Sequence, residues 1–116
     1  DIYIVNSYGK TKSFYNNCKN IFLGGSIVNH GGQNPLEATR FGCNILHGPN
    51  IYNFKEIYKF LKLNKMSINI TNQKQMVIWI NKFFNKKSSS RIIKKKMKLI
   101  GRKVLDKTYK EIEFFL

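Results

Sequence analysis

Short apolar runs alternate with stretches of helical periodicity along the chain, and turn residues separate the two. Runs at Ile2–Val5, Asn20–Leu23, Asn44–His47 and Ser67–Ile70 predict four buried strands. Helical patterns lie between and after them. Strands that alternate with helices predict right-handed βαβ units and therefore an α/β fold with a mainly parallel sheet flanked by helices.

Capping residues help to define where several of the predicted helices begin and end. Asn34 as N-cap, Pro35 at the first helical position and Glu37 in the first turn agree on a helix start. Gly42 is well placed as the residue that ends this helix. A short earlier helix runs through Phe14 and Tyr15.

Three further helices are predicted in the second half of the chain. Asn53 is expected to cap a helix over 54–63, and Asn72 to open one that ends before the serines 88–90. A long basic helix follows to about Tyr109. Its apolar residues (Ile93, Met97, Ile100 and Val104) recur at helical spacing, which predicts a core-facing stripe with a lysine-rich back.

The length of 116 residues favours one domain. Within it, residues 1–70 hold the strand and helix alternation with the glycine-rich segment, and residues 71–116 form basic C-terminal helices. The first residue is Asp1 rather than Met, and a strand-like run begins at once. We therefore expect sequence upstream, including another domain.

The net charge of +15 is concentrated in the second half of the chain. Residues 1–50 carry four basic and two acidic side chains, whereas residues 51–116 carry seventeen and four. Eighteen of the basic residues are Lys and three are Arg, and nucleic-acid recognition usually favours Arg. The basic half is compatible with anionic lipid headgroups, with RNA, or with plain solvation. No apolar run approaches the ~20 residues of a membrane span.

The cysteines and histidines predict no metal centre. Cys18 and Cys43 are too few and too isolated for a disulfide framework, and they show no paired C-x2-C spacing. Cys43 and His47 share a face of the third strand, and with Cys18 and His30 they make up the available ligand types. Reduced thiols are the better interpretation.

Glycine is concentrated where a ligand would meet the main chain. Six of the eight glycines fall between Gly24 and Gly48. The segment that contains them is predicted to be a strand, then a glycine-rich loop, then the start of a helix. This arrangement favours binding of a phosphate or another anion. In open α/β sheets, ligands also bind at the carboxyl ends of the strands.

The polar residues at the end of this loop can be interpreted as structural or as ligand-binding. Glu37 either reaches back to the helix start in a capping box or accepts the two hydroxyls of a nucleotide ribose. Asn34 is either a helix cap or a ligand to the same anion. Gln33 at the loop end is usually a solvated side chain.

An ordered string of these residues resembles the 3-deoxy-D-manno-octulosonic acid (Kdo) transferases of lipopolysaccharide synthesis. The family pattern is G-G-S, then G-G-[HQ]-N-P-x-E, then G-P-x3-N-F. In this chain it reads Gly24-Gly25-Ser26, Gly31-Gly32-Gln33-Asn34-Pro35-Leu36-Glu37, and Gly48-Pro49 followed by Asn53-Phe54. The resemblance is strong over 24–54 and topological after about Leu63.

The resemblance implies the Rossmann-like, C-terminal half of a GT-B glycosyltransferase, with CMP-Kdo as donor and a lipid A precursor as acceptor. It implies inverting transfer without metal or other cofactor, at the cytoplasmic face of the bacterial inner membrane. Glu37 would hold the ribose, and Asn34 with the Gly31 and Gly32 amides would meet the phosphate. Gly24, Gly25 and Ser26 would line the donor cleft. The general base of the family lies in the N-terminal domain, so this chain alone is expected to be inactive.

One departure from the family pattern lies before the first helix. Relatives read D-T-x-G-E-L where this chain reads Asn6-Ser7-Tyr8-Gly9-Lys10-Thr11. The Glu of that motif helps to build the donor site, so Lys10 reverses a local charge. Either Lys10 contacts a phosphate or carboxylate of the donor, or activity is reduced.

Two other functions stay open at this point. A GT-B domain for a different nucleotide sugar would carry the same ribose and phosphate contacts. A basic RNA-binding or membrane-surface module would rest on the charge of residues 51–116 and would bind polyanions with a steep salt dependence. No helix-turn-helix or RNP-type signature supports specific nucleic-acid binding.

Overall fold

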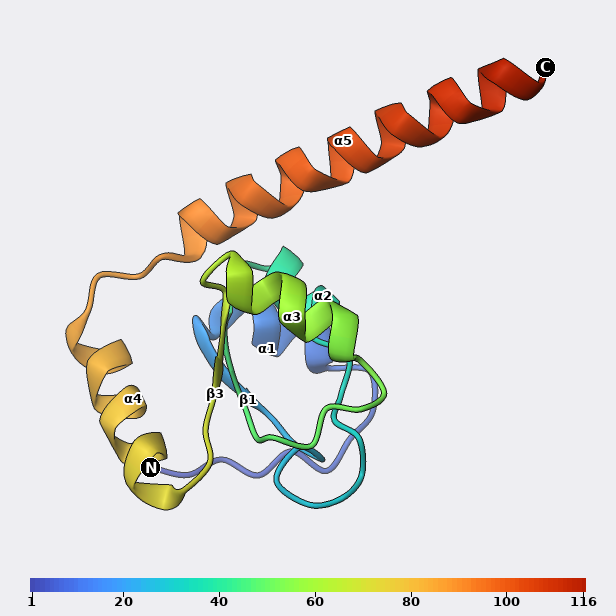
Figure 1. Ribbon diagram of the computed structural model, residues 1–116. Coiled ribbons are helices and arrows are strands. Elements are labelled where there is room, and N and C mark those ends of the chain that lie inside the picture. The colour runs from blue at the N-terminus through green and yellow to red at the C-terminus, as the bar shows by residue number, and fades with distance from the viewer.

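A three-stranded parallel sheet forms the centre of the protein. The computed structural model describes residues 1–116, and its sheet consists of β1 (Asn20–Leu23), β2 (Asn44–His47) and β3 (Ser67–Asn69). The strands lie in the order β1-β2-β3, with all neighbours parallel (Figure 1). The predicted α/β class and parallel sheet are confirmed.

Five helices surround or extend from this sheet. They are α1 (Thr11–Asn17), α2 (Leu36–Arg40), α3 (Lys55–Leu63), α4 (Gln73–Asn85) and α5 (Ser90–Phe115). Their positions match the predicted helices, except that α5 continues to Phe115 rather than stopping near Tyr109. No helix is both long enough and apolar enough to cross a membrane.

The alternation of side chains along β2 divides the helices between two faces of the sheet. Ile45 is fully buried in a cluster with Ala38 of α2 and Tyr58 of α3. Leu46 points to the other face, where it lines a small cavity with Met76 and Ile80 of α4. The first face is a packed core, whereas α4 contributes no fully buried residue to the second.

The long helix α5 packs only through its first turns. Ile93 is buried against Leu61 and Met66, and Met97 packs at the edge of this second cluster. Gly42 makes the approach possible, because a Cβ there would lie 2.5 Å from the Ser90 carbonyl oxygen. Beyond these turns α5 extends away from the rest of the chain (Figure 1).

The predicted core stripe of α5 is therefore wrong in its second half. Ile93 is buried and Ile100 is half-buried, but Val104 is 61% exposed and every residue after Ile100 is exposed. Helical spacing reports that one side of a helix is apolar. It does not report whether another element of the same chain covers that side.

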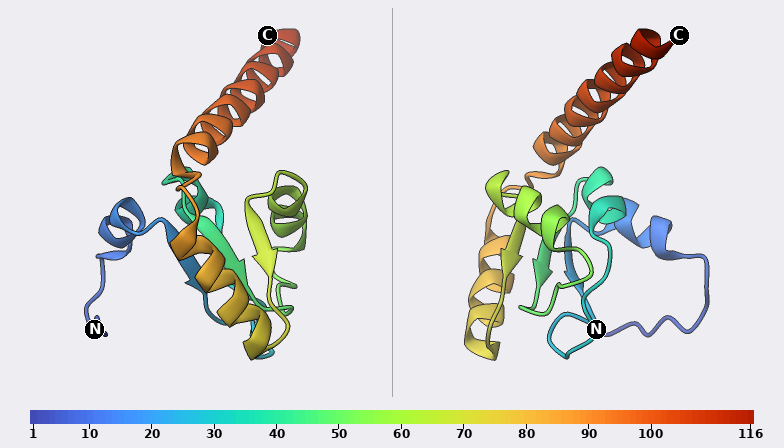
Figure 2. Two further views of the ribbon diagram at one scale, coloured as in Figure 1. Left: turned by 90° about the vertical axis from the view of Figure 1, so that its left-hand side faces the viewer. Right: turned by 45° about the vertical axis from the view of Figure 1, so that its right-hand side comes forward.

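The predicted strand at Ile2–Val5 is also wrong. Residues 1–9 form no strand, and Ile2, Tyr3 and Ile4 are each more than 80% exposed. Figure 2 shows the N-terminal segment standing away from the sheet, which leaves the outer edge of β1 unpaired. A strand needs a hydrogen-bonding neighbour, and an apolar run alone does not supply one.

The predicted helix caps have mixed outcomes. The Asn72 side chain accepts a hydrogen bond from the Gln75 amide at 2.9 Å, as expected of an N-cap. Gly42 lies just past α2 with a φ of 83°, as expected of the residue that ends a helix. Asn53 is not the cap of α3, because its amide group donates to the His30 carbonyl across the molecule.

Candidate functional site

The glycine-rich loop joins β1 to α2 at the carboxyl ends of β1 and β2. Ser26 anchors it, since the Ser26 hydroxyl donates to the Leu23 carbonyl at 2.6 Å and accepts from the Gly48 amide at 2.8 Å. The side chain is completely buried. Ser26 therefore holds the two strand ends together, and its hydroxyl is occupied in doing so.

Two glycines give the loop its shape. The Gly32 amide donates to the Gly25 carbonyl at 2.9 Å, which closes the loop on itself. Gly25 and Gly32 have φ values of 67° and 79°, a region that side chains with a Cβ rarely occupy. Glycine is thus required by the backbone conformation at these positions.

Residues from the β2–α3 connection and α3 hold the loop from the other side. The Asn50 amide group donates to the Ile27 carbonyl, and that of Asn53 donates to the His30 carbonyl. The Tyr58 hydroxyl donates to the Gln33 carbonyl at 2.9 Å. Sequence reasoning missed these three loop contacts, although Asn53 was already part of the family string.

Main-chain donors remain free at both ends of the loop. The amides of Gly24 and Gly25 after β1, and those of Gln33 and Asn34 before α2, donate to no protein acceptor. Gly24, Gln33 and Asn34 are exposed. Of the two glycines expected to meet the phosphate, both are buried, and the Gly32 amide is bonded to the Gly25 carbonyl whereas the Gly31 amide donates to no protein acceptor.

Asn34 and Glu37, at the start of α2, differ in whether their side chains bond to the backbone of the helix. The Asn34 side-chain oxygen accepts from the Leu36 amide at 3.0 Å, but α2 begins at Leu36 and its N-cap position is Pro35, one residue later than predicted. Glu37 makes no capping hydrogen bond, and its nearest charged partner is the Lys12 ammonium at 3.8 Å. Both side chains of that ion pair are largely exposed, which limits its contribution to at most about 1 kcal/mol. The Glu37 carboxylate is available to a ligand.

Lys10 and Gln33 keep exposed side chains. Lys10 immediately precedes α1, and its side chain forms no hydrogen bond or ion pair. Lys12, two residues further along the chain, is the residue that pairs with Glu37, and the sequence pattern did not single it out. The Gln33 side-chain nitrogen lies near Gly25, where it would be 3.6 Å from an added Cβ.

His47 and Tyr58 form a buried aromatic pair beneath the loop. Their ring centroids are 4.3 Å apart, and His47 Nδ1 lies 2.7 Å from the Gly48 carbonyl oxygen. Burial lowers the pKa of His47, and this effect outweighs the hydrogen bond to Gly48. Burial also raises the pKa of Tyr58 to about 12. Both groups are therefore neutral near pH 7, and their role is to support the loop.

The lowered pKa of His47 predicts that acid destabilises the fold. Below the ordinary pKa of histidine, the unfolded chain binds a proton that the folded chain resists, so the free energy of unfolding falls as the pH falls. Urea unfolding between pH 7.5 and 5 is expected to show this decrease. In His47→Gln that part of the pH dependence should disappear, and an unchanged slope in the variant would assign it to another group.

The thiols and histidines do not gather into a metal site. The Cys43 thiol is buried and donates to the carbonyls of Tyr15 and Cys18 at 3.3 and 3.2 Å, and burial raises its pKa to about 11. Both cysteines are free thiols. No three His, Cys, Asp or Glu side chains lie close enough together to hold a metal ion.

Comparison with known proteins gives one consistent result. No protein-family model matches the chain. The chain is 26% identical over 101 residues to a 3-deoxy-D-manno-octulosonic acid transferase of Aquifex aeolicus, a match covering 87% of this chain and 29% of that protein. It is 40% identical over 55 residues to the enzyme of the same name from Haemophilus influenzae, covering 47% of this chain and 13% of the relative. A Rickettsia prowazekii enzyme of this name is 33% identical over 85 residues, covering 73% and 18%.

A solved structure shares the fold. The C-terminal CMP-Kdo binding domain of WaaA from Acinetobacter baumannii superposes with a TM-score of 0.67 at 23% identity, covering 77% of this chain and 47% of that one. The chain is thus related in sequence to the Kdo transferases, which confirms the resemblance seen in its motifs, and it has the fold of a GT-B-type domain. It spans less than a third of the length of the curated relatives it matches.

Proposed function

We propose that this relative of the Kdo transferases is their nucleotide-sugar-binding domain, with CMP-Kdo as its ligand. The observation that carries the proposal is the arrangement around the glycine-rich loop. Free main-chain amides of Gly24, Gly25, Gln33 and Asn34 flank a helix start, and the Glu37 carboxylate stands beside them without a capping bond. Amides attract phosphate, and a carboxylate accepts hydrogen bonds from ribose hydroxyls.

These contacts support a role for each residue in the proposed complex. Glu37 holds the ribose, while the amides of Gly24 and Gly25 face the phosphate and sugar. Asn34 holds the start of α2 in place through its bond to the Leu36 amide, and its own amide faces the phosphate. Ser26 positions the loop from below. Gly25, Gly31 and Gly32, which all have positive φ, shape it, and Gln33 and Lys10 reach the donor only from the rim.

In the whole protein this domain would supply half of an inverting glycosyltransferase. Electrostatic stabilisation of the CMP leaving group by amides and the helix start would be its contribution to transfer. The general base and the site for the lipid A precursor would belong to an N-terminal domain, so the isolated chain would bind donor without turnover. We place the enzyme at the cytoplasmic face of the inner membrane, where the lysine-rich half would be attracted to anionic headgroups.

Calorimetric titration of the chain with CMP, UMP, AMP and a short RNA tests this proposal. CMP is expected to bind more tightly than UMP or AMP, at one site and with weak salt dependence. Preference for another nucleotide would point to a GT-B domain for a different sugar donor. Equal binding of all four ligands, lost steeply as salt is raised, would replace the proposal with a basic polyanion-binding module.

A further inference from the structure

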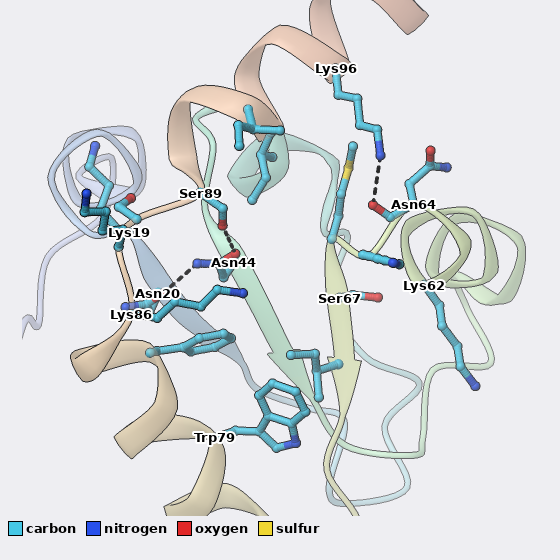
Figure 3. A pocket seen from close by; sticks show the side chains of 18 of the residues that line it. Lys19, Asn20, Asn44, Lys62, Asn64, Ser67, Trp79, Lys86, Ser89 and Lys96 are labelled. Atoms are coloured by element: carbon cyan, nitrogen blue, oxygen red, sulfur yellow. Dashed lines mark hydrogen bonds between the residues drawn. The ribbon is translucent and has the colours of Figure 1, made fainter.

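A second cavity lies at the amino ends of the strands, opposite the glycine-rich loop. Its volume is about 720 Å³, and its wall includes Asn20, Asn44 and Ser67, the first residues of the three strands. α4 and the connection from Lys86 to Ser89 border it on one side, and the first turns of α5 border it on another (Figure 3). None of the residues proposed to bind nucleotide belongs to this wall.

The charge around this cavity has one sign. Six lysines line it: Lys19, Lys62, Lys65, Lys86, Lys87 and Lys96. Neither Asp nor Glu is among its nineteen lining residues, and the ion pairs of the structure involve other lysines. Clustered cations without counter-charges create a local positive potential that favours a bound anion. Lysine in particular binds phosphate as a mobile point charge.

Part of the cavity wall is apolar. The apolar lining residues are Trp79 and Phe83 of α4, Met66 just before β3, Ile68 of β3, and Ile92 and Ile93 of α5. Phe84 and Ile92 are 82% and 68% exposed, so solvent reaches the apolar wall. A free inorganic anion would leave this surface uncovered. A ligand with both a phosphate and an apolar part would use the whole cavity.

The polar end of the cavity is held in place by hydrogen bonds. The Ser89 hydroxyl donates to Asn44, and the Asn44 amide group donates to Asn20, both at 2.8 Å. Lys96 Nζ donates to the Asn64 carbonyl at 3.3 Å. Figure 3 shows Lys86 extending over the sheet beside Asn44, whereas Lys62 extends away on the outer side of α3. Ser67, on the same wall, has a buried hydroxyl without a hydrogen-bond partner.

We propose that this cavity binds an amphiphile whose phosphate group gives it a net negative charge. The phosphate lies beside Lys86 at the polar end, and the apolar part lies against Trp79 and Phe83. The ammonium groups of Lys19 and Lys96 donate to the Asn16 and Asn64 carbonyls and add to the positive potential from either side. The phosphate group is the chemistry that the lysines recognise, and the apolar wall favours a lipid-like carrier over free phosphate. The site would act in addition to the nucleotide site, since it is built from other residues at the other end of the sheet.

Fluorescence of Trp79, the single tryptophan of the chain, gives a direct test. Dihexanoylphosphatidic acid, kept below its micelle concentration, is expected to change the Trp79 emission saturably. It should bind about five-fold or more tightly than inorganic phosphate or dihexanoylphosphatidylcholine. Equal affinity for inorganic phosphate would assign the site to the free anion and overturn the amphiphile. Equal affinity for the phosphatidylcholine would show that the site does not require a net anion and would overturn the proposal. No saturable change in emission would mean that the cavity does not bind the lipid.

A matched pair of double variants separates the cavity from general charge. Lys86→Gln with Lys96→Gln removes two cavity lysines and should weaken binding of the phosphatidic acid about ten-fold. Lys103→Gln with Lys110→Gln removes the same charge from the exposed part of α5 and should change binding less than about two-fold. Equal losses in both would overturn the proposal in favour of net-charge attraction. If thermal unfolding shows that the first pair is not folded, Lys86→Gln alone replaces it, and an unchanged affinity there would have the same meaning.

Discussion

Gly48→Ala is expected to destabilise the fold by about 2–4 kcal/mol. A Cβ at residue 48 would lie 2.3 Å from the Ser26 carbonyl oxygen and 2.5 Å from the Ser26 carbonyl carbon. Both atoms are main chain, so the clash cannot be relieved by rotating a side chain. The loop must move away from β2, and the hydrogen bond between the Gly48 amide and the Ser26 hydroxyl is then lost. Urea unfolding of the variant measures the loss.

Gly101→Ala is the matched control for this substitution. Gly101 lies within α5, and an added Cβ there would meet nothing within 4 Å. Alanine is the better helix former, so this variant should be unchanged or more stable by about 0.5–1 kcal/mol. A Gly48→Ala variant as stable as Gly101→Ala would contradict the close contact between the β1 and β2 ends on which the site is built.

Glu37→Gln is expected to weaken CMP binding by about ten-fold or more while leaving the fold intact. The carboxylate accepts hydrogen bonds from two ribose hydroxyls in the proposed complex, and bonds to a charged group are worth about 1.5–3 kcal/mol each. Gln keeps the size but loses the charge and one acceptor. Because Glu37 makes no capping bond and only a loose ion pair with Lys12, folding stability should change by less than about 1 kcal/mol. Calorimetry with CMP measures the affinity.

Glu56→Gln provides the same chemical change at an equivalent place. Glu56 is the acidic residue in the first turn of α3, as Glu37 is in the first turn of α2, and it is exposed. Its replacement should leave CMP affinity unchanged. A similar loss of affinity in both variants would mean that CMP responds to overall charge and that Glu37 has no particular role.

Much of the architecture was readable from the sequence because its signals are local. β1, β2 and β3 are short apolar runs bounded by turn residues, and the start of α4 carries its own cap. The strand expected at Ile2–Val5 and the core stripe expected along α5 were wrong for a shared reason. Each required a partner surface, and the identity of a partner cannot be read from the segment itself.

The position of the glycine-rich loop in the fold was predicted from the sequence, and the hydrogen bonds within it were not. The glycine-rich loop lies at the carboxyl ends of β1 and β2 as expected, and Glu37 is free of the capping bond that was its other interpretation. The Ser26 hydroxyl and the Gly32 amide are engaged within the loop, which the sequence did not indicate. Tyr58 and Asn53 support the loop from distant positions, and no spacing rule predicts such long-range bonds.

The most direct test of the central claim is an NMR titration of the isotope-labelled chain with CMP. The proposed site predicts shifts confined to residues 24–37, with large changes at the amides of Gly24, Gly25 and Glu37 and little change in α4 or α5. Shifts spread over the lysine-rich helices, similar for CMP and a short RNA and fading with salt, would contradict it. So would the absence of any shift at millimolar CMP.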